Sequence, residues 1–174
     1  MKFEVVDHVP FALEEVYSTM RDKLIDLVPF LPDVKKIELV ERKELDNGNV
    51  KIVNNWFAED KIPKALKSLI KADELGWVDH AEWEEANKTV HWNLEMMFFK
   101  EYVTVRGTNK FTGDNDSTTV TLAGDLELDL AKHPMVPRLL AKSITKQVEK
   151  IVLMLIKPNL VKVNRGIEKH LSEN

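Results

Sequence analysis

The sequence predicts an α+β protein in which a curved antiparallel sheet of about seven strands packs against one long C-terminal helix. Over roughly the last forty residues, apolar side chains recur at gaps of three and four, which is typical of a helix with one buried face. Before them, segments of alternating apolar and polar residues follow one another through short polar turns. Short turns join antiparallel neighbours, so these segments are expected to form one sheet.

The composition is that of an ordinary globular protein. The 174 residues show no repeat and no low-complexity linker, so we expect one domain over residues 1–174. A formal net charge of -4 gives no support to nucleic-acid binding. The absence of cysteine excludes disulfides, thiolate metal sites and cysteine nucleophiles. With no secretory leader and no apolar run of about 20 residues, we expect a cytoplasmic protein without stable membrane insertion, although transient membrane contact stays open.

Seven segments have the alternation or the flanking turn residues of strands. They are Lys2–Val9, Val34–Leu45, Val50–Phe57, Gly76–Glu84, Thr89–Phe99, Tyr102–Phe111 and Thr118–Leu130. Alternation is clearest in Thr89–Phe99, which gives one apolar face. Asp46-Asn47-Gly48-Asn49 predicts a hairpin turn, because asparagine and glycine tolerate positive φ. Gly124 interrupts the last strand and indicates a bulge or a bend.

Helical spacing occurs in three places. Leu13–Val28 is expected to be a helix that stops at Pro29. Lys61–Lys71 has the pattern of a short amphipathic helix and could act as a lid. The C-terminal helix is expected to begin at Pro134 and to span roughly 35 Å before Pro158, which should kink or break it.

This order of elements resembles the helix-grip fold of the START-like superfamily, which includes birch-pollen allergen-like proteins, lipid-transfer START domains and polyketide cyclase-like proteins. The resemblance covers essentially the whole chain and rests on element order, not on a motif. Members typically hold an apolar ligand between the sheet and the long helix. The resemblance therefore implies a START-like domain that binds or transports a small hydrophobic molecule, such as a lipid, and no cofactor is expected.

A narrower likeness is to the PRELI/MSF1 phospholipid-carrier family. It rests on Arg21 late in the first helix, on the Lys61-Ile62-Pro63 step and on the Asn159-x-x-Lys162 step. In that family such groups meet a phosphate head group, so the likeness implies Arg21, Lys61 and Lys162 as head-group ligands. Charge-assisted hydrogen bonds would suit that role, but solvated surface charge explains the same residues. The Tyr-Pro-Asn-Pro segment that should follow Arg21 is absent.

The cavity implied by the fold is expected to be lined by large aromatic rings, flexible methionine and residues of the facing helix. The expected lining residues are Trp56, Trp77, Trp92, Leu94, Met96, Phe98, Leu126, Leu139, Ser143 and Ile144. Aromatic bodies and soft methionines suit an irregular apolar ligand. The same side chains would also fill an ordinary packed core.

No pattern of residues demands catalysis. Nucleophile-elbow, Walker, dinucleotide-binding and zinc-protease motifs are absent, and no histidine pair has the i, i+4 spacing of a helical metal site. We therefore assign neither a catalytic residue nor a metal ligand. One alternative is a protein-interaction module with a packed core, which would show an exposed apolar patch instead of a pocket.

A second alternative is a cyclase- or aromatase-like enzyme acting on a polyketide or aromatic substrate. It requires an ionisable side chain pointing into the cavity. His91, Asn93 and Glu95 are out of phase with the Trp92 face, which argues against it. Asp79 belongs to an acidic group that continues at 82–85, and such carboxylates do acid–base work only if they are buried.

Overall fold

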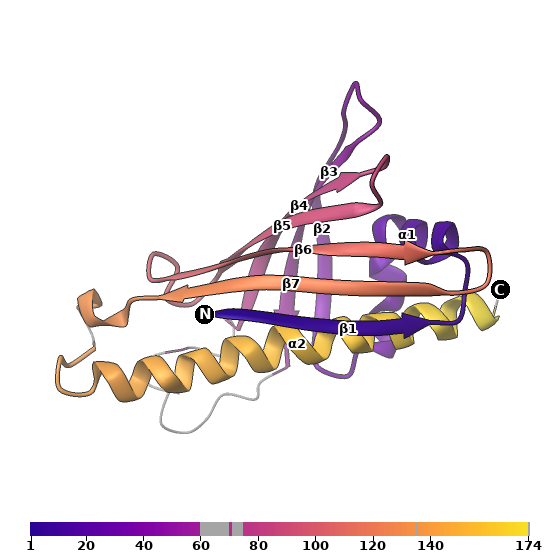
Figure 1. Ribbon diagram of the computed structural model, residues 1–174. Helices are drawn as coiled ribbons and strands as arrows, with labels where there is room; N and C mark the ends of the chain where they lie inside the picture. The colour runs from indigo at the N-terminus through magenta and orange to yellow at the C-terminus, as the bar shows by residue number, and fades with distance from the viewer. Residues whose placement is uncertain (60–69, 71–74, 135, 174) are drawn as a thin grey trace.

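Seven antiparallel strands form one curved sheet in the order β1-β7-β6-β5-β4-β3-β2 (Figure 1). The computed structural model describes residues 1–59, 70, 75–134 and 136–173, without the side chains of 155–160. The strands are β1 (Lys2–Val9), β2 (Val34–Glu44), β3 (Val50–Ala58), β4 (Gly76–Glu84), β5 (Thr89–Met96), β6 (Val103–Gly113) and β7 (Thr118–Leu128). The predicted α+β class and sheet are therefore confirmed, including the hairpin at Gly48, whose φ is +81°.

Four helices complete the described part of the chain. They are α1 (Leu13–Asp22), the 3-10 helices η1 (Leu24–Phe30) and η4 (Leu130–Lys132), and α2 (Ala141–Glu173). The prediction of one helix over Leu13–Val28 is wrong in its second half, where η1 follows α1. Pro29 lies inside η1, and proline removes a backbone donor while steering the preceding residue away from α-helical geometry.

The long helix α2 starts later and runs further than predicted. It begins at Ala141 instead of Pro134, and turns occupy the preceding segment, with Leu140 N–H donating to Pro137 C=O at 2.8 Å. Pro134 and Pro137 each bias the residue before them away from the helix. Pro158 does not break α2, because buried side chains hold the helix on both sides: Val148, Ile151, Val152, Val163 and Ile167.

Figure 1 shows α2 lying along β1 and β7, while the strands from β5 to β2 turn away across the sheet. The backbone of α2 comes closest to η1, β1, η4, α1 and β7. Buried and less buried side chains alternate along most strands, and we call the side of the sheet that carries the buried ones the inner face. The central strands β3, β4 and β5 carry the large aromatic side chains of that face.

Gly124 does not form the predicted bulge. The pairing of β6 with β7 runs without a shift through Gly107 and Gly124, which lie directly opposite each other. A Cβ on Gly124 would lie 2.5 Å from the Phe3 ring and 3.0 Å from the Trp92 ring. The two glycines therefore make room for flat aromatic packing, and the register shifts lie instead between β2 and β3.

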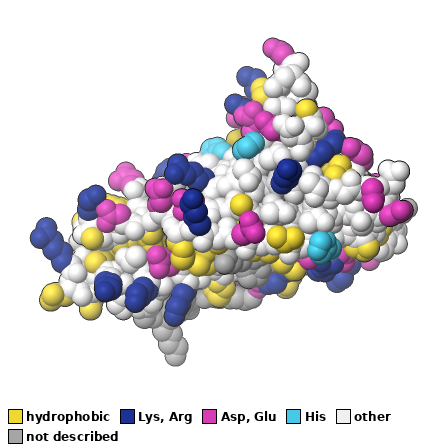
Figure 2. All heavy atoms as spheres, viewed as in Figure 1, with side chains coloured by type: hydrophobic (Ala, Val, Ile, Leu, Met, Phe, Trp, Pro, Cys, Tyr) yellow, Lys and Arg dark blue, Asp and Glu magenta, His cyan; other side chains and the backbone are white. Residues whose placement is uncertain are grey.

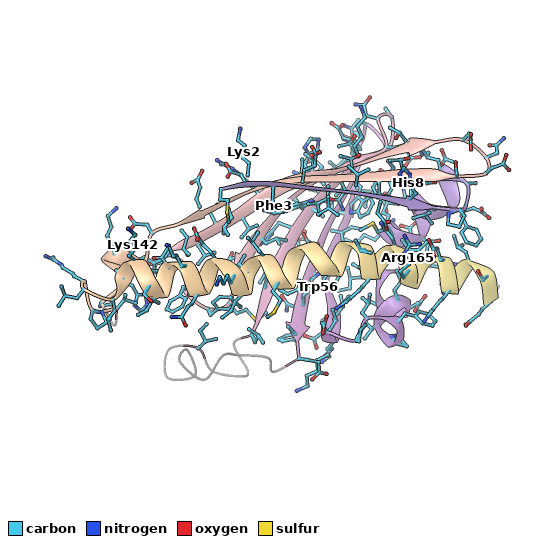
Figure 3. All side chains as sticks on the ribbon, turned by 60° about the horizontal axis from the view of Figure 1, so that its bottom comes forward. Lys2, Phe3, His8, Trp56, Lys142 and Arg165 are labelled. Atoms are coloured by element: carbon cyan, nitrogen blue, oxygen red, sulfur yellow. The ribbon has the colours of Figure 1, made fainter. Side chains whose placement is uncertain are left out.

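An ion pair joins the C-terminal half of α2 to β1. Arg165 Nη2 lies 2.7 and 2.8 Å from the two carboxylate oxygens of Asp7 and also donates to the His8 carbonyl (Figure 3). Asn164, which is wholly buried, donates to Asp7 at 2.9 Å. Asp7 thus accepts from the buried Asn164 Nδ2 and from the Arg165 guanidinium at once.

We expect Asp7→Ala to lower the free energy of unfolding by about 2–3 kcal/mol, because it leaves the buried Asn164 amide without its acceptor. Urea unfolding followed by circular dichroism measures the change. Asp116→Ala, in the exposed β6–β7 loop, is the matched control and should shift stability by less than about 0.5 kcal/mol. Equal effects of the two substitutions would contradict the anchoring role.

Candidate functional site

Two polar side chains interrupt the apolar inner face at one level of the sheet. Asn54 on β3 and Asp79 on β4 are register partners, and Asp79 is also opposite Leu94 on β5. The neighbouring levels are apolar, with Trp56 opposite Trp77 on one side. Asn54 is buried at 6% exposure, while Asp79 keeps some accessible surface and is half-buried. A carboxyl group therefore points into a wall made mainly of hydrocarbon and indole.

The Asp79 carboxyl has no charged partner among the described residues. Its Oδ1 atom is buried and forms no hydrogen bond there. Burial raises the pKa of Asp79 to about 7, and the nearby Trp56 indole opposes this only in part. Trp56 Nε1 makes no hydrogen bond of good geometry to any residue that the structure describes, so it is not a full partner. Near neutral pH the carboxyl is thus poised between a neutral form that donates and a charged form that only accepts.

Aromatic side chains flank this carboxyl. The Trp56 and Trp77 rings are stacked, with centroids 5.4 Å apart and planes 17° from parallel. One level away on β5, Trp92 donates its Nε1–H to Asn109 Oδ1 at 2.9 Å, in a buried bond. This bond fixes the Trp92 ring across the two glycines of β6 and β7. The walls beside Asp79 therefore present flat π surfaces of defined orientation.

A pocket of about 240 Å³ reaches the inner face from outside. It lies between the α1–η1 segment and the β2–β3 edge, and Ile52 and Asn54 contribute the sheet side. Its other lining residues are Arg21, Asp22, Lys23, Leu24, Ile25, Asp26, Leu39 and Arg42. Asp22 ties the two arginines together, since it accepts from Arg21 and from Arg42 at 2.8 Å each. Asp79 does not line this pocket, but its cross-strand partner Asn54 does.

A second group of unpaired polar atoms lies beneath α1. The Tyr17 hydroxyl and Trp83 Nε1 are buried without hydrogen-bond partners among the described residues, and the two rings meet edge-on at 5.3 Å. Arg21 and Lys88 lie over the Tyr17 ring. Burial raises the pKa of Tyr17 to about 12, so its phenol stays neutral at physiological pH. This corner packs α1 onto the sheet, and we assign it no chemistry.

The predicted cavity residues divide into two groups. Seven are buried: Trp56, Trp77, Trp92, Leu94, Met96, Leu126 and Phe98. Strand pairing places the first six of these on the inner face, while Phe98 follows the end of β5. Ile144 is half-buried against the core. Leu139, 99% exposed, lies in the turns before α2, because the helix starts at Ala141, and Ser143 lies on the exposed side of the first helical turn. That the buried residues line a ligand cavity stays a prediction.

Two of the three head-group candidates are described, and they have different ion-pair partners. Arg21 pairs with Asp22 at 2.8 Å and with Glu85 at 2.7 Å. Lys162 on α2 forms an ion pair with Asp33. Lys61 lies outside the described residues, as does the predicted helical lid Lys61–Lys71 except for the buried Ile70. Of the two candidates that the structure describes, Arg21 reaches the pocket and Lys162 does not.

Sequence reasoning placed Asp79 within an acidic group and did not single out Asn54. Strand phase carries the missing signal, since Asn54 falls between Ile52 and Trp56 on the apolar positions of β3. The placement of His91 and Asn93 on the exposed side is confirmed. His91 lies 3.7 Å from Glu84 on that outer side. Among the described residues no group of His, Asp or Glu could hold a metal ion.

A scan against protein-family models finds no match for the chain, and neither does a search of curated proteins. Solved structures do match over nearly the full length. A protein of Thermus thermophilus shares 21% identity over 97% of this chain and 95% of its own, with a TM-score of 0.63. The Zhui aromatase/cyclase of a Streptomyces species shares 13% over 98% and 92%, with a TM-score of 0.67. Norcoclaurine synthase of Thalictrum flavum shares 10% over 100% and 87%, with a TM-score of 0.63.

These likenesses show that the chain has the helix-grip fold, so the predicted resemblance to START-like proteins is confirmed at the level of the fold. The narrower likeness to phospholipid carriers stays a prediction. Within the described residues, no helix is both long enough and apolar enough to cross a bilayer.

Proposed function

We propose that this helix-grip protein binds a small, largely apolar molecule, such as a lipid or an aromatic compound, between its inner face and α2. Asp79 and Asn54 hold the one polar group of that ligand. The observation that carries the proposal is the buried Asp79 Oδ1, without a partner among the described residues, in a wall of tryptophan and leucine. An unpaired buried polar group is costly, and a carboxyl with a raised pKa in an apolar wall is a candidate for a functional group.

The chemistry of the pair suggests the polar group of the ligand. A protonated Asp79 donates one hydrogen bond, and the Asn54 amide both donates and accepts. A hydroxyl or phenol, which also donates and accepts, would satisfy both side chains, while the stacked Trp56 and Trp77 rings contact the apolar body. The 240 Å³ pocket beside Asn54 supplies a route from solvent. Norcoclaurine synthase, which shares the fold, has been solved with dopamine and hydroxybenzaldehyde, and this supports an aromatic guest.

The test has two stages. Native mass spectrometry and organic extraction of the gently purified protein should reveal a bound apolar molecule. Binding of two probes is then compared, 2-naphthol with its hydroxyl and 2-methylnaphthalene without one, by quenching of the inner-face tryptophans. Asp79→Ala should weaken 2-naphthol binding by about five- to tenfold and leave 2-methylnaphthalene nearly unchanged.

Glu95→Gln is the matched control, because Glu95 is a carboxylate on the outer side of the neighbouring strand, close to His80 and Lys100. This substitution should leave the binding of both probes unchanged. Equal binding of both probes to the wild type and to Asp79→Ala would refute the polar anchor. A crystal structure with side chains filling all the space between the inner face and α2 would refute ligand binding itself.

A cyclase- or aromatase-like enzyme is the second candidate, and Asp79 is the observation that favours it. A carboxyl with a pKa near 7 is matched to proton transfer at neutral pH. In that case Asp79→Asn would retain a bound aromatic or polyketide substrate and stop its conversion. A carrier, by contrast, releases its ligand chemically unchanged, and mass spectrometry of the released molecule separates the two.

A further inference from the structure

Two adjacent leucines project into solvent where α2 begins. Leu139 is 99% exposed and Leu140 is 53% exposed, in the turns that precede Ala141. Val136 and Ala141, on either side, are buried at 4% and 6% exposure. The segment is thus attached to the body of the protein while its apolar side chains point outward. Single exposed leucines are common, but an adjacent pair on an anchored turn is a typical interaction feature.

Basic side chains flank Leu139 and Leu140, which we call the leucine tip, and continue along the first turns of α2. Arg138, Lys142, Lys146 and Lys150 are exposed, and none forms an ion pair with a residue that the structure describes. Residues 129–150 hold five Lys or Arg with Glu149 and Asp129, which pairs with Lys132, a net charge of +3 in a chain whose total is -4. Figure 3 places Lys142 at this end of the molecule, and Figure 2 shows Lys and Arg side chains together with apolar ones there.

The first turn of α2 carries no acidic residue that would offset these basic side chains. The N–H groups of Ala141, Ser143 and Ile144 already donate to carbonyls of the preceding turns, so the end of the helix adds little to the site. Lys142 and Lys146 form no ion pair with a described residue, and an external anion would supply their counter-charge.

We propose that the leucine tip docks on an anionic lipid bilayer, with Leu139 and Leu140 entering the boundary of the acyl chains and the four basic side chains meeting lipid phosphates. Shape favours this occupant over a protein. The tip is a narrow projection with diffuse charge around it, whereas stable protein interfaces bury about 800 Å² on each partner. Apolar insertion combined with basic residues is the usual requirement for reversible membrane binding. The proposal stands independently of the ligand.

The experiment is co-sedimentation of the full chain with vesicles, either of phosphatidylcholine alone or of phosphatidylcholine and phosphatidylserine in equal parts. The wild type should bind the anionic vesicles and barely bind the neutral ones, and added salt should weaken binding. Leu139→Ser with Leu140→Ser, or Lys142→Glu with Lys146→Glu, should each reduce the bound fraction by about tenfold or more in partition coefficient.

Matched controls remove similar groups elsewhere. Val6→Ser with Val40→Ser takes away two apolar side chains that are 52% and 58% exposed, and Lys2→Glu with Lys110→Glu reverses two exposed charges. Both double variants should bind like the wild type. The proposal is overturned if the wild type does not prefer anionic vesicles or if the leucine variant binds unchanged. It is also overturned if gel filtration shows that the leucine variant dissociates a dimer, since a second copy would then be the occupant.

Discussion

Replacement of Asp79 by asparagine is expected to stabilise the protein by about 2–4 kcal/mol at pH 8 while it weakens binding of a hydroxylated ligand. Because burial raises the pKa of Asp79 to about 7, the folded state binds a proton more tightly than the unfolded chain does, where the carboxyl has its ordinary value of 3.8. The contribution of Asp79 to stability is therefore most favourable below about pH 4, falls as the pH rises from about 4 to 7, and stays unfavourable above that. Asparagine has a similar shape and never carries the charge.

The full difference between the two pKa values, at about 1.4 kcal/mol per unit, would give about 4–5 kcal/mol, and the remaining accessibility of Asp79 reduces the expected effect to about 2–4 kcal/mol. Urea unfolding of Asp79→Asn and of the wild type at pH 5 and pH 8 measures this difference in the free energy of unfolding. The advantage of Asp79→Asn should be large at pH 8 and shrink toward pH 5. Asp116→Asn, on an exposed loop, is the control and should show no such dependence. If Asp79→Asn is less stable than the wild type at pH 8, the carboxyl has a partner in solution and is no anchor for a ligand.

This combination of effects would distinguish a functional carboxyl from a structural one. If a carboxylate is retained for folding, as we expect for Asp7, its replacement by a neutral residue lowers the stability of the protein. If it is retained for binding, the same replacement raises the stability of the protein and lowers its affinity for the ligand, because the folded protein tolerates an unfavourable group that only the ligand satisfies.

Gly107→Ala is expected to destabilise the protein by about 3 kcal/mol or more, a fall in Tm of roughly 6–12 °C. An added Cβ would lie 2.2 Å from the Ala123 carbonyl oxygen and 2.5 Å from the Trp92 ring. The backbone of β7 cannot move away without breaking ladder bonds, and the buried bond from Trp92 to Asn109 holds the ring in place. Thermal unfolding followed by circular dichroism measures the change, and tryptophan fluorescence should report the displaced ring.

Gly166→Ala is the matched control for the same chemical change. Its added Cβ would lie 3.4 Å from Phe30 Cβ, a contact at the edge of the ordinary range, and alanine favours a helix interior by about 1 kcal/mol over glycine. This variant should be as stable as the wild type or slightly more so. A small effect of Gly107→Ala, similar to that of Gly166→Ala, would contradict the close packing of Trp92 on β6.

Local patterns in the sequence were sufficient for the sheet. Alternation depends only on residues two positions apart, so β1 and β4 were predicted with their observed bounds. A hairpin turn depends on a few consecutive residues, so the hairpin at Gly48 was also predicted. The long helix was recognised for the same reason, since an apolar stripe repeats every three or four residues. Its predicted start at Pro134 is too early, and the sequence left open whether the helix continues through Pro158. Both depend on packing of α2 against distant segments.

The sequence by itself determined the class of fold and the apolar face of the clearly alternating strands, such as Thr89–Phe99, because these follow from spacing along the chain. Only the tertiary structure decided which polar group lies inside without a partner among the described residues, since the strand pairing that sets Asn54 beside Asp79 joins residues far apart in sequence. It also decided that Leu139 faces solvent, because the start of α2 sets which side of the chain meets the core. Desolvation and exposure are properties of the assembled surroundings of a residue, and no local pattern encodes them.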